Sequence, residues 1–349
     1  MMVDEYVAYE EAHNTAPNEH ATRSTTLGLV SAADIVAMDL PPVRFVVSGY
    51  IAEGLTLLAG KPKTGKSYMA LGLAVAVASG SRAFGSIPCE QGDVLYLALE
   101  DNRRRLQRRL KQMLPHGGIP ERLFIDTDCK RLGMGGEDLI RECVDRMEKP
   151  RLIVVDVLAK VRPDRRQTES LYDVDYRAME PLQRIASEWG IAVLALHHTR
   201  KMEAEDPFDT VSGSTGLTGA ADSVLVLSRD GQGITLYGRG RDIEEIETAM
   251  QFDHITGSWS IMGDASEVRR SDERTVILDA LKEAPATLGP AKIAAATGLK
   301  ENNVRRLILK MVEQGQIVKT GYGHYAHPNR TDLMGGGNSG HTGNSWPGD

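Results

Sequence analysis

The chain has 349 residues, which is enough for about two domains. Hydrophobic residues make up 41% and charged residues 26%, the balance of a globular protein, and with only 5% aromatic residues its core must be mostly aliphatic. The longest apolar run, 69–78, is about half a membrane span, and the first residues lack the pattern of a signal peptide. Three scattered cysteines exclude a disulfide framework or a zinc cluster. We therefore expect a cytoplasmic protein without a membrane partner.

The net charge of −7 is unevenly distributed along the chain. Residues 269–325 carry ten Lys/Arg against six Asp/Glu, a surplus of +4, whereas residues 1–268 carry −10 and residues 326–349 carry −1. A basic module thus follows an acidic one. This asymmetry says more about nucleic-acid binding than the total charge does.

The N-terminal residues predict little regular structure. Residues 1–24 are polar and aperiodic, and we expect them to be disordered. Ser31 is placed to cap a short helix, which Pro41 and Pro42 end by forcing an extended path. The sequence predicts a disordered or loosely structured arm over residues 1–40.

A glycine-rich turn, 60–67, follows an apolar run typical of a buried strand, 54–59, and precedes a helix-like stretch. It matches G-x-x-x-x-G-K-[ST], which aims backbone N–H groups and a helix N-terminus at phosphates. The alternative, an ordinary Gly-rich turn, is disfavoured by the complete motif and its flanks. We expect ATP and Mg²⁺, with Lys66 reaching the β- and γ-phosphates and Ser67 holding the metal. The candidate nucleotide-binding residues are Gly60, Lys61, Pro62, Lys63, Thr64, Gly65, Lys66, Ser67 and Tyr68.

A second apolar run, 93–99, ends at Glu100 and Asp101. Carboxylates at the C-terminal end of a parallel strand lie at the edge where open α/β sheets bind ligands. The basic helix predicted at 103–111 would grip DNA or a neighbouring subunit, or, more commonly, present a solvated face. A short strand at 123–125 and a helix over 136–149 are expected next.

The third run, 152–156, ends in Asp156, about 95 residues beyond the start of the turn. An aliphatic run that closes on Asp is the expected second half of a P-loop site, where the Asp holds Mg²⁺. Val157 follows, where many P-loop ATPases place the catalytic Glu, so the base must come from elsewhere. Glu100 is the best candidate and Asp101 the fallback, and a surface or helix-capping role is the alternative for Glu100.

The fourth run, 191–196, follows a predicted helix over 173–189 and ends at His197 and His198. A polar group at this position would contact the γ-phosphate or a bound water and report the nucleotide state. The alternative is a pair of hydrogen-bonded surface histidines. A metal role is disfavoured because no third ligand is evident.

Two long polar loops, 160–171 and 201–219, accompany these strands, and such loops in compact domains are usually functional or disordered. Beyond them, 221–228 and 233–237 predict a β-hairpin. One last edge pair is expected over 252–262.

The C-terminal module predicts three helices and a hairpin, the pattern of a winged helix-turn-helix. The expected elements are a helix over 272–283 capped by Ser271, a helix over 290–296, a helix over 300–314 and a hairpin over 317–325. The third helix would enter a major groove of duplex DNA, with Lys319 near phosphate. Because a surplus of +4 is modest, a module that docks on a replication protein instead stays open. We expect the Gly- and Asn-rich end of the chain to be disordered.

In their order along the chain, these motifs resemble RecA-like hexameric helicases, close to the RepA-like replicative helicases of plasmids and phages. The similarity covers about residues 40–262. Apart from the turn, its motifs are specific only in order and spacing. The matching segments are 60–67, 97–101, 153–156, 194–199 and 239–241.

The resemblance implies a catalytic role for Glu100 and a sensor at His197 or His198. It also implies arginine fingers, at Arg241 with Arg239, which reach into the site of the next subunit. Arg239-Gly240-Arg241 departs from the Lys-x-Arg of many relatives, and Arg229 competes for the same role.

The resemblance further implies a homo-oligomer, a hexameric ring whose loops at about 160–171 and 201–218 line a pore for single-stranded DNA. A separate physical argument supports a finger. An Arg supplied in trans stabilises the charge on the γ-oxygens and is worth roughly 10³–10⁵ in rate.

The sequence thus predicts an α/β protein. A RecA-like P-loop NTPase domain with a mostly parallel sheet spans 41–265, a winged helix spans 269–326, and a disordered tail spans 327–349. We expect an ATP-dependent DNA helicase or translocase of phage or plasmid replication. The alternatives are a recombination mediator or helicase loader, and an ATP-controlled DNA-binding regulator, which would not need the base Glu100. A small-molecule kinase would leave the C-terminal module unexplained.

Overall fold

The computed structural model describes residues 29–165, 167–199, 204–211, 216–231 and 233–333. The chain divides into two compact units, Met1–Pro42 and Val43–Asp349. The disorder predicted for residues 1–24 and 334–349 lies outside the described residues. The tail, for which the sequence predicts disorder from residue 327, is described as far as Leu333, where a short helix forms, η2 (Thr331–Leu333). Arg330 donates to Lys282 O at 3.1 Å, so this first part of the tail has defined contacts.

The first unit contains one described helix, α2 (Ala32–Ala37), in which no residue is buried. Ser31 caps it, as predicted, because its hydroxyl accepts a hydrogen bond from Asp34 N. Several large apolar side chains of residues 29–40 are exposed, among them Leu29 at 86% and Val36 at 86%. A short helix cannot bury this surface within itself.

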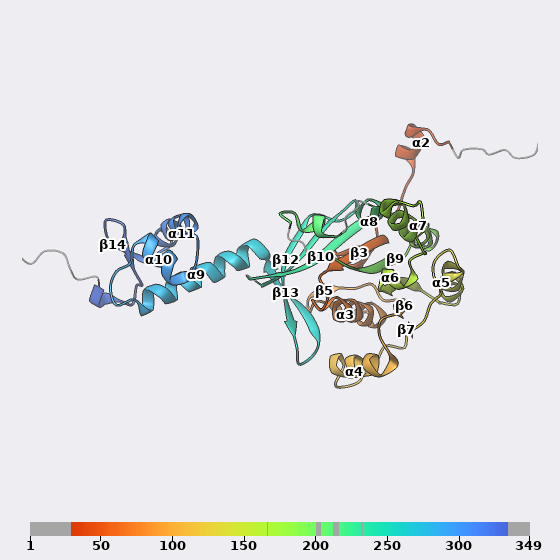
Figure 1. Ribbon diagram of the computed structural model, residues 1–349, viewed down its shortest axis with the longest axis horizontal. Helices are drawn as coiled ribbons and strands as arrows, with labels where there is room; N and C mark the ends of the chain where they lie inside the picture. The colour runs from red at the N-terminus through yellow and green to blue at the C-terminus, as the bar shows by residue number, and fades with distance from the viewer. Residues whose placement is uncertain (1–28, 166, 200–203, 212–215, 232, 334–349) are drawn as a thin grey trace, which may run out of the picture. The chain divides into compact units, whose positions relative to one another are not determined.

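Nine strands of the described chain form the central sheet of the second unit, in the order β13-β12-β11-β10-β3-β9-β8-β6-β7 (Figure 1). The six from β10 to β7 run parallel, and β11, β12 and β13 extend them antiparallel, which confirms the mostly parallel α/β sheet. The bounds are β3 Gly54–Gly60, β6 Asp93–Ala98, β7 Leu123–Asp126, β8 Pro150–Asp156, β9 Ala192–His198, β10 Ser223–Asp230, β11 Gly233–Gly240, β12 Ile246–Asp253 and β13 Ser258–Asp264.

Each face of the sheet has its own hydrophobic core. Helix α3 (Lys66–Ser79) packs on one face and helix α7 (Leu171–Trp189) on the other (Figure 1). Because side chains alternate along a strand, neighbours such as Leu57 and Leu58 enter different cores, with Leu58 on the α3 side. The same alternation decides which polar group at a strand end faces which helix.

The remaining elements of this domain connect or edge the sheet. They are β1 (Phe45–Val47), β2 (Ile51–Ala52), β4 (Arg82–Ala83), β5 (Ile87–Pro88), α4 (Arg103–Met113), α5 (Gly136–Asp145), α6 (Leu158–Val161), η1 (Pro207–Thr210) and α8 (Gly216–Ala220). The segment 80–88 between α3 and β6 holds the antiparallel pair β4–β5. The helix expected to reach residue 149 ends at Asp145, because the chain must turn before Pro150 begins β8.

The C-terminal module has the predicted three helices and hairpin: α9 (Ala265–Glu283), α10 (Pro290–Thr297), α11 (Glu301–Glu313), β14 (Val318–Gly321) and β15 (His324–Ala326). Its core contains the inner face of α11, formed by Val304, Leu307, Ile308 and Met311, each at most 2% exposed. Gly298 ends α10 in the left-handed conformation (φ 72°), as a glycine after a helix commonly does.

The predicted cap at Ser271 is wrong. Helix α9 begins seven residues earlier, and its cap is Asp264, whose carboxylate accepts from Ser266 N and Glu267 N. The first turns of α9 are largely exposed and lack an apolar period, so the sequence pattern conceals them.

Candidate active site

Four strands end together at one edge of the sheet. Gly60, the last residue of β3, lies opposite His198 of β9 and Leu227 of β10. Asp156, the last residue of β8, lies opposite Ala98 of β6. The turns that leave these strands therefore meet at the N-terminus of α3, where the four candidate segments come together.

The turn between β3 and α3 has room for glycine alone at its two ends. A Cβ on Gly60 would lie 2.6 Å from Leu227 O. Gly65 has φ +96°, and a Cβ there would lie 2.7 Å from a ring carbon of Trp259. Trp259, from β13, also donates its indole N–H to Gly65 O at 3.2 Å. This tight turn, followed at once by a helix, has the shape of a phosphate cradle.

Lys66 is buried beneath the turn, at 4% exposure. Its Nζ donates to Gly60 O at 2.7 Å and to Lys61 O at 3.0 Å, and lies 3.2 Å from His198 Nδ1. Burial lowers its pKa to about 8, although the charges of Asp156 and Glu100 act in the opposite direction. The amino group is thus cationic at neutral pH and held among acceptors that a phosphate oxygen can replace.

Ser67 and Asp156 form a pair of oxygen ligands suited to Mg²⁺. Ser67 Oγ donates to Asp156 Oδ1 at 3.2 Å, and the buried Tyr96 hydroxyl donates to Asp156 Oδ2 at 2.8 Å. Burial raises the pKa of Asp156, and these two hydrogen bonds oppose the rise. A hydroxyl and a carboxylate are hard donors that fit Mg²⁺. Tyr96 was not among the predicted residues, although its place two residues before Ala98 puts it on the α3 face.

Glu100 and Asp101 are held very differently. Glu100 Oε2 lies 3.6 Å from His198 Nε2, and the side chain of Glu100 is 46% exposed. Asp101 is 7% exposed and forms ion pairs with both Arg105 and Arg109. The structure therefore leaves Glu100 accessible and gives the fallback candidate Asp101 a structural role. Two arginines of the basic helix α4 therefore form ion pairs within the chain.

The two histidines lie on opposite faces of β9. His198 follows the positions that face α3 and contacts Lys66 and Glu100. His197 faces the α7 side, where its ring bonds to the backbone of Val211 and lies near Asp175. Burial lowers its pKa to about 4, so it is neutral at pH 7. Only His198 is placed to contact a nucleotide directly.

Arg239 and Arg241 lie at the other edge of the sheet. Antiparallel pairing puts Gly240 opposite Ser223, which in turn lies opposite Thr56 near the start of β3. Arg229 lies at the turn edge instead, beyond Leu227. A side chain at the far edge cannot reach the turn of its own chain.

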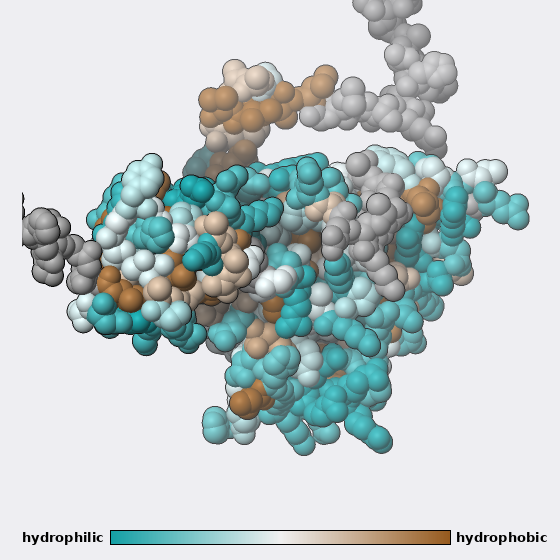
Figure 2. Space-filling view, turned by 60° about the vertical axis from the view of Figure 1, so that its left-hand side comes forward, coloured by the Kyte–Doolittle hydropathy of each residue, from teal (hydrophilic) through white to brown (hydrophobic). Residues whose placement is uncertain are grey.

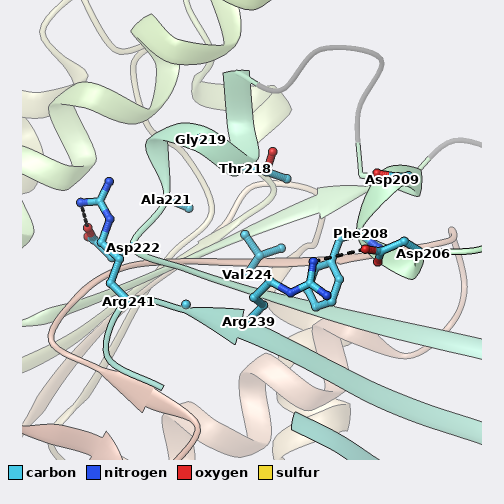
Figure 3. A pocket seen from close by; sticks show the side chains of 11 residues that line it. Asp206, Phe208, Asp209, Thr218, Gly219, Ala221, Asp222, Val224, Arg239 and Arg241 are labelled. Carbon is cyan, nitrogen blue, oxygen red and sulfur yellow. Dashed lines mark hydrogen bonds and ion pairs between the residues drawn. The ribbon is translucent and has the colours of Figure 1, made fainter. Parts of the chain in front are cut away.

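A cavity of about 390 Å³ separates these two arginines (Figure 3). Arg239 is held by Asp206 at 3.2 Å and Glu245 at 3.1 Å and lies over the Phe208 ring, 4.4 Å from its centroid. Arg241 has Asp222 at 3.3 Å, and its side chain is 66% exposed. Of the two, Arg241 is the freer to contact another chain. Asp222 itself is anchored, since it accepts from Leu55 N at 2.9 Å.

No group of three His, Cys, Asp or Glu side chains suited to a metal occurs among the described residues. Within the same ranges, no helix is both long and apolar enough to cross a membrane.

A phosphate-cradling turn with a buried lysine and a Ser/Asp pair, on a mostly parallel sheet, defines the class of P-loop ATPases. Residues 20–204 match the AAA domain family, and because they make up more than half of the chain, the protein belongs to that family. The match includes the turn, Glu100, Asp156 and both histidines. Residues 275–321 match the IclR helix-turn-helix domain.

Two solved structures share the RecA-like fold. A solved ATPase domain superposes with a TM-score of 0.51 at 16% identity, covering 65% of this chain and 94% of that one. A DnaB-like replicative helicase, solved in a study of its interactions with primase, gives 0.51 at 14% identity, covering 73% and 71%. At such identities the similarity establishes the fold alone. No curated protein sequence matches this chain.

Proposed function

We propose that this protein is a Mg²⁺- and ATP-dependent DNA translocase or helicase of the RepA-like type, serving phage or plasmid DNA replication. The observation that supports it most is the division of catalytic groups between two sheet edges. The turn, Glu100 and His198 share one edge, and Arg241 lies at the other. A complete site then needs two copies of the chain, as in a ring.

The residues at this edge of the sheet would have different roles in ATP hydrolysis, according to their chemistry. Backbone N–H groups of the turn and the N-terminus of α3 bind phosphate oxygens, and Lys66 neutralises the charge that develops on them. Ser67 and Asp156 would hold Mg²⁺, which would supply neutralisation of the phosphate charge. Glu100 would orient the attacking water and accept its proton, and His198 lies between it and Lys66, with Nε2 3.6 Å from Glu100 Oε2 and Nδ1 3.2 Å from Lys66 Nζ.

Adjacent residues of β9 would couple ATP hydrolysis to the loops that we expect to contact DNA. His198 faces the turn, whereas His197 bonds to the backbone of Val211 and lies near Arg162 and Asp175, which form an ion pair at 2.6 Å. Arg162 and Val211 belong to the two loops expected to line a pore. A shift of the end of β9 on loss of the γ-phosphate would therefore move both loops.

The apolar residues 29–40 support assembly as well. Most of their large side chains are exposed in a single chain, and Figure 2 shows the brown patch they form. Exposed apolar surface of this kind marks interaction sites. We propose that it is covered in the homo-oligomer, which we take to be a hexamer. The winged helix would bind duplex DNA or a replication protein.

The test is the rate of ATP hydrolysis with and without single-stranded DNA, together with strand displacement from a forked duplex. We expect stimulated turnover and displacement, both lost in Lys66→Ala and both kept in Lys111→Ala, an exposed lysine of α4. Turnover without displacement would favour a mediator or a loader. Turnover that persists in Lys66→Ala would refute the site.

A further inference from the structure

A second cavity, of about 350 Å³, lies between α9 and α11 and is strongly basic. Its lining holds four arginines and a lysine and no carboxylate, in a chain whose net charge is −7. The lining residues are Ser266, Arg269, Arg270, Arg274, Arg306, Leu307 and Lys310.

The cavity is basic because of where the charged side chains lie, and not because α9 carries a surplus of positive charge. Helix α9 carries four basic and five acidic residues, yet its three arginines gather on one face. Arg270 and Arg274 are four residues apart, a spacing at which like charges repel. Glu273 lies near this face but accepts a hydrogen bond from Asn303 at 2.8 Å and does not line the cavity. Repulsion between these arginines lowers the stability of the helix, and an anion bound beside them would reduce that repulsion.

The cations of the cavity have few partners within the described residues. Arg270 bonds only to Ser266, and Arg306 only to Asn303. Arg274 Nε is buried and has no hydrogen-bond partner there. Arg269 alone pairs with a carboxylate, Glu247, at 3.2 Å. A buried guanidinium N–H without an acceptor costs free energy, and an anion bound in the cavity would supply the acceptor.

We propose that this cavity binds the sugar-phosphate backbone of duplex DNA beside the groove that α11 enters. The inference rests on the proposed DNA contact of the winged helix and adds the linking helix α9 to it. From Ser266 to Arg274, α9 is about 12 Å long. One DNA strand carries a phosphate every ~3.4 Å of axis, so several successive phosphates fit this length. Arg306 and Lys310 extend the contact onto α11.

The test compares Arg270→Gln/Arg274→Gln with the wild-type full-length chain in binding to a labelled random-sequence duplex, by fluorescence anisotropy at 50–200 mM KCl. Loss of two phosphate contacts lowers the slope of log K against log salt by about 1.8. Over this range the wild type should thus lose about tenfold more affinity than the variant. Arg146→Gln/Arg184→Gln, which removes the same charge from exposed sites at the end of α5 and on α7, should keep the wild-type slope.

Arg306→Gln/Lys310→Gln provides a second variant on an exposed face, and it should lower the slope likewise. Equal slopes in the cavity variants and the control would overturn the proposal, as would a wild type that binds no duplex. Inorganic pyrophosphate that stabilises the wild type and not Arg270→Gln/Arg274→Gln, with DNA binding unchanged, would show a free-anion site instead. ATP turnover on single-stranded DNA, measured on the same samples, tests the proposed translocase separately.

Discussion

At the scale of single residues, the strand ends separate groups that the sequence presents as neighbours. Glu100 and Asp101 are adjacent, but only Glu100 is accessible beside Lys66 and His198. We expect Glu100→Gln to lower kcat by about 10²–10⁴ because the proposed general base is lost, with ATP affinity kept. Steady-state ATPase assays and nucleotide titrations check both quantities.

Asp101→Asn is the matched comparison, because it changes the same group one residue away. It breaks the ion pairs with Arg105 and Arg109, so we expect a loss of about 1–3 kcal/mol in unfolding free energy and less than a tenfold change in kcat. A catalytic loss in Asp101→Asn as large as in Glu100→Gln would reassign the base.

The lowered pKa of His197 leads us to expect that the stability of the protein depends on pH. Its folded pKa of about 4 lies below the ordinary 6.5, so between pH 7 and 5 the unfolded chain takes up a proton that the folded chain excludes. Stability is therefore lost as pH falls, by about 2 kcal/mol over this window. Urea unfolding at both pH values should show this loss in the wild type and in the exposed-site variant His116→Gln. A His197→Gln protein with the same loss would contradict the assignment.

At the scale of elements, α9 depends on a cap that the sequence pattern hides. Asp264→Ala should cost about 1 kcal/mol, because the carboxylate accepts from two backbone N–H groups of the first turn. Ser271→Ala, inside the helix, should change stability by less than about 0.5 kcal/mol. Urea unfolding followed by circular dichroism measures both, and the opposite ranking would restore Ser271 as the helix start.

Apolar periodicity and turn chemistry predict most elements of this fold. The runs that end at Gly60, Glu100, Asp156 and His198 become β3, β6, β8 and β9, and Val304 to Met311 line the core of the C-terminal module. Where helices are exposed, as in the first turns of α9, no apolar period marks their start. Contacts between distant residues, such as Trp259 with Gly65, are outside the reach of any local pattern.

The sequence predicts the individual residues of the site, but it does not predict which of them contact one another. The motif gives Lys66 and Ser67, and the strand ends give Asp156 and Glu100. Only the three-dimensional structure shows that Tyr96 donates a hydrogen bond to Asp156 and that Arg109 forms an ion pair with Asp101. It also shows that His197 and His198 face different cores.

At the scale of the whole molecule, the proposed function assigns complementary groups of one reaction to the two edges of the sheet. The phosphate-binding turn lies at one edge, and Arg241, 66% exposed, lies at the other. In the proposed ring, hydrolysis would depend on assembly, because each site would take its base from one chain and its arginine from the next.

Mixing Arg241→Ala with Glu100→Gln tests this claim most directly, because each chain supplies what its neighbour lacks. Either variant alone should hydrolyse ATP slowly. Equal mixtures should regain turnover at the interfaces that join an intact Glu100 to an intact Arg241, with a maximum at intermediate ratios. An ATPase rate that stays at the level of the separate variants at every ratio would contradict a site shared between chains.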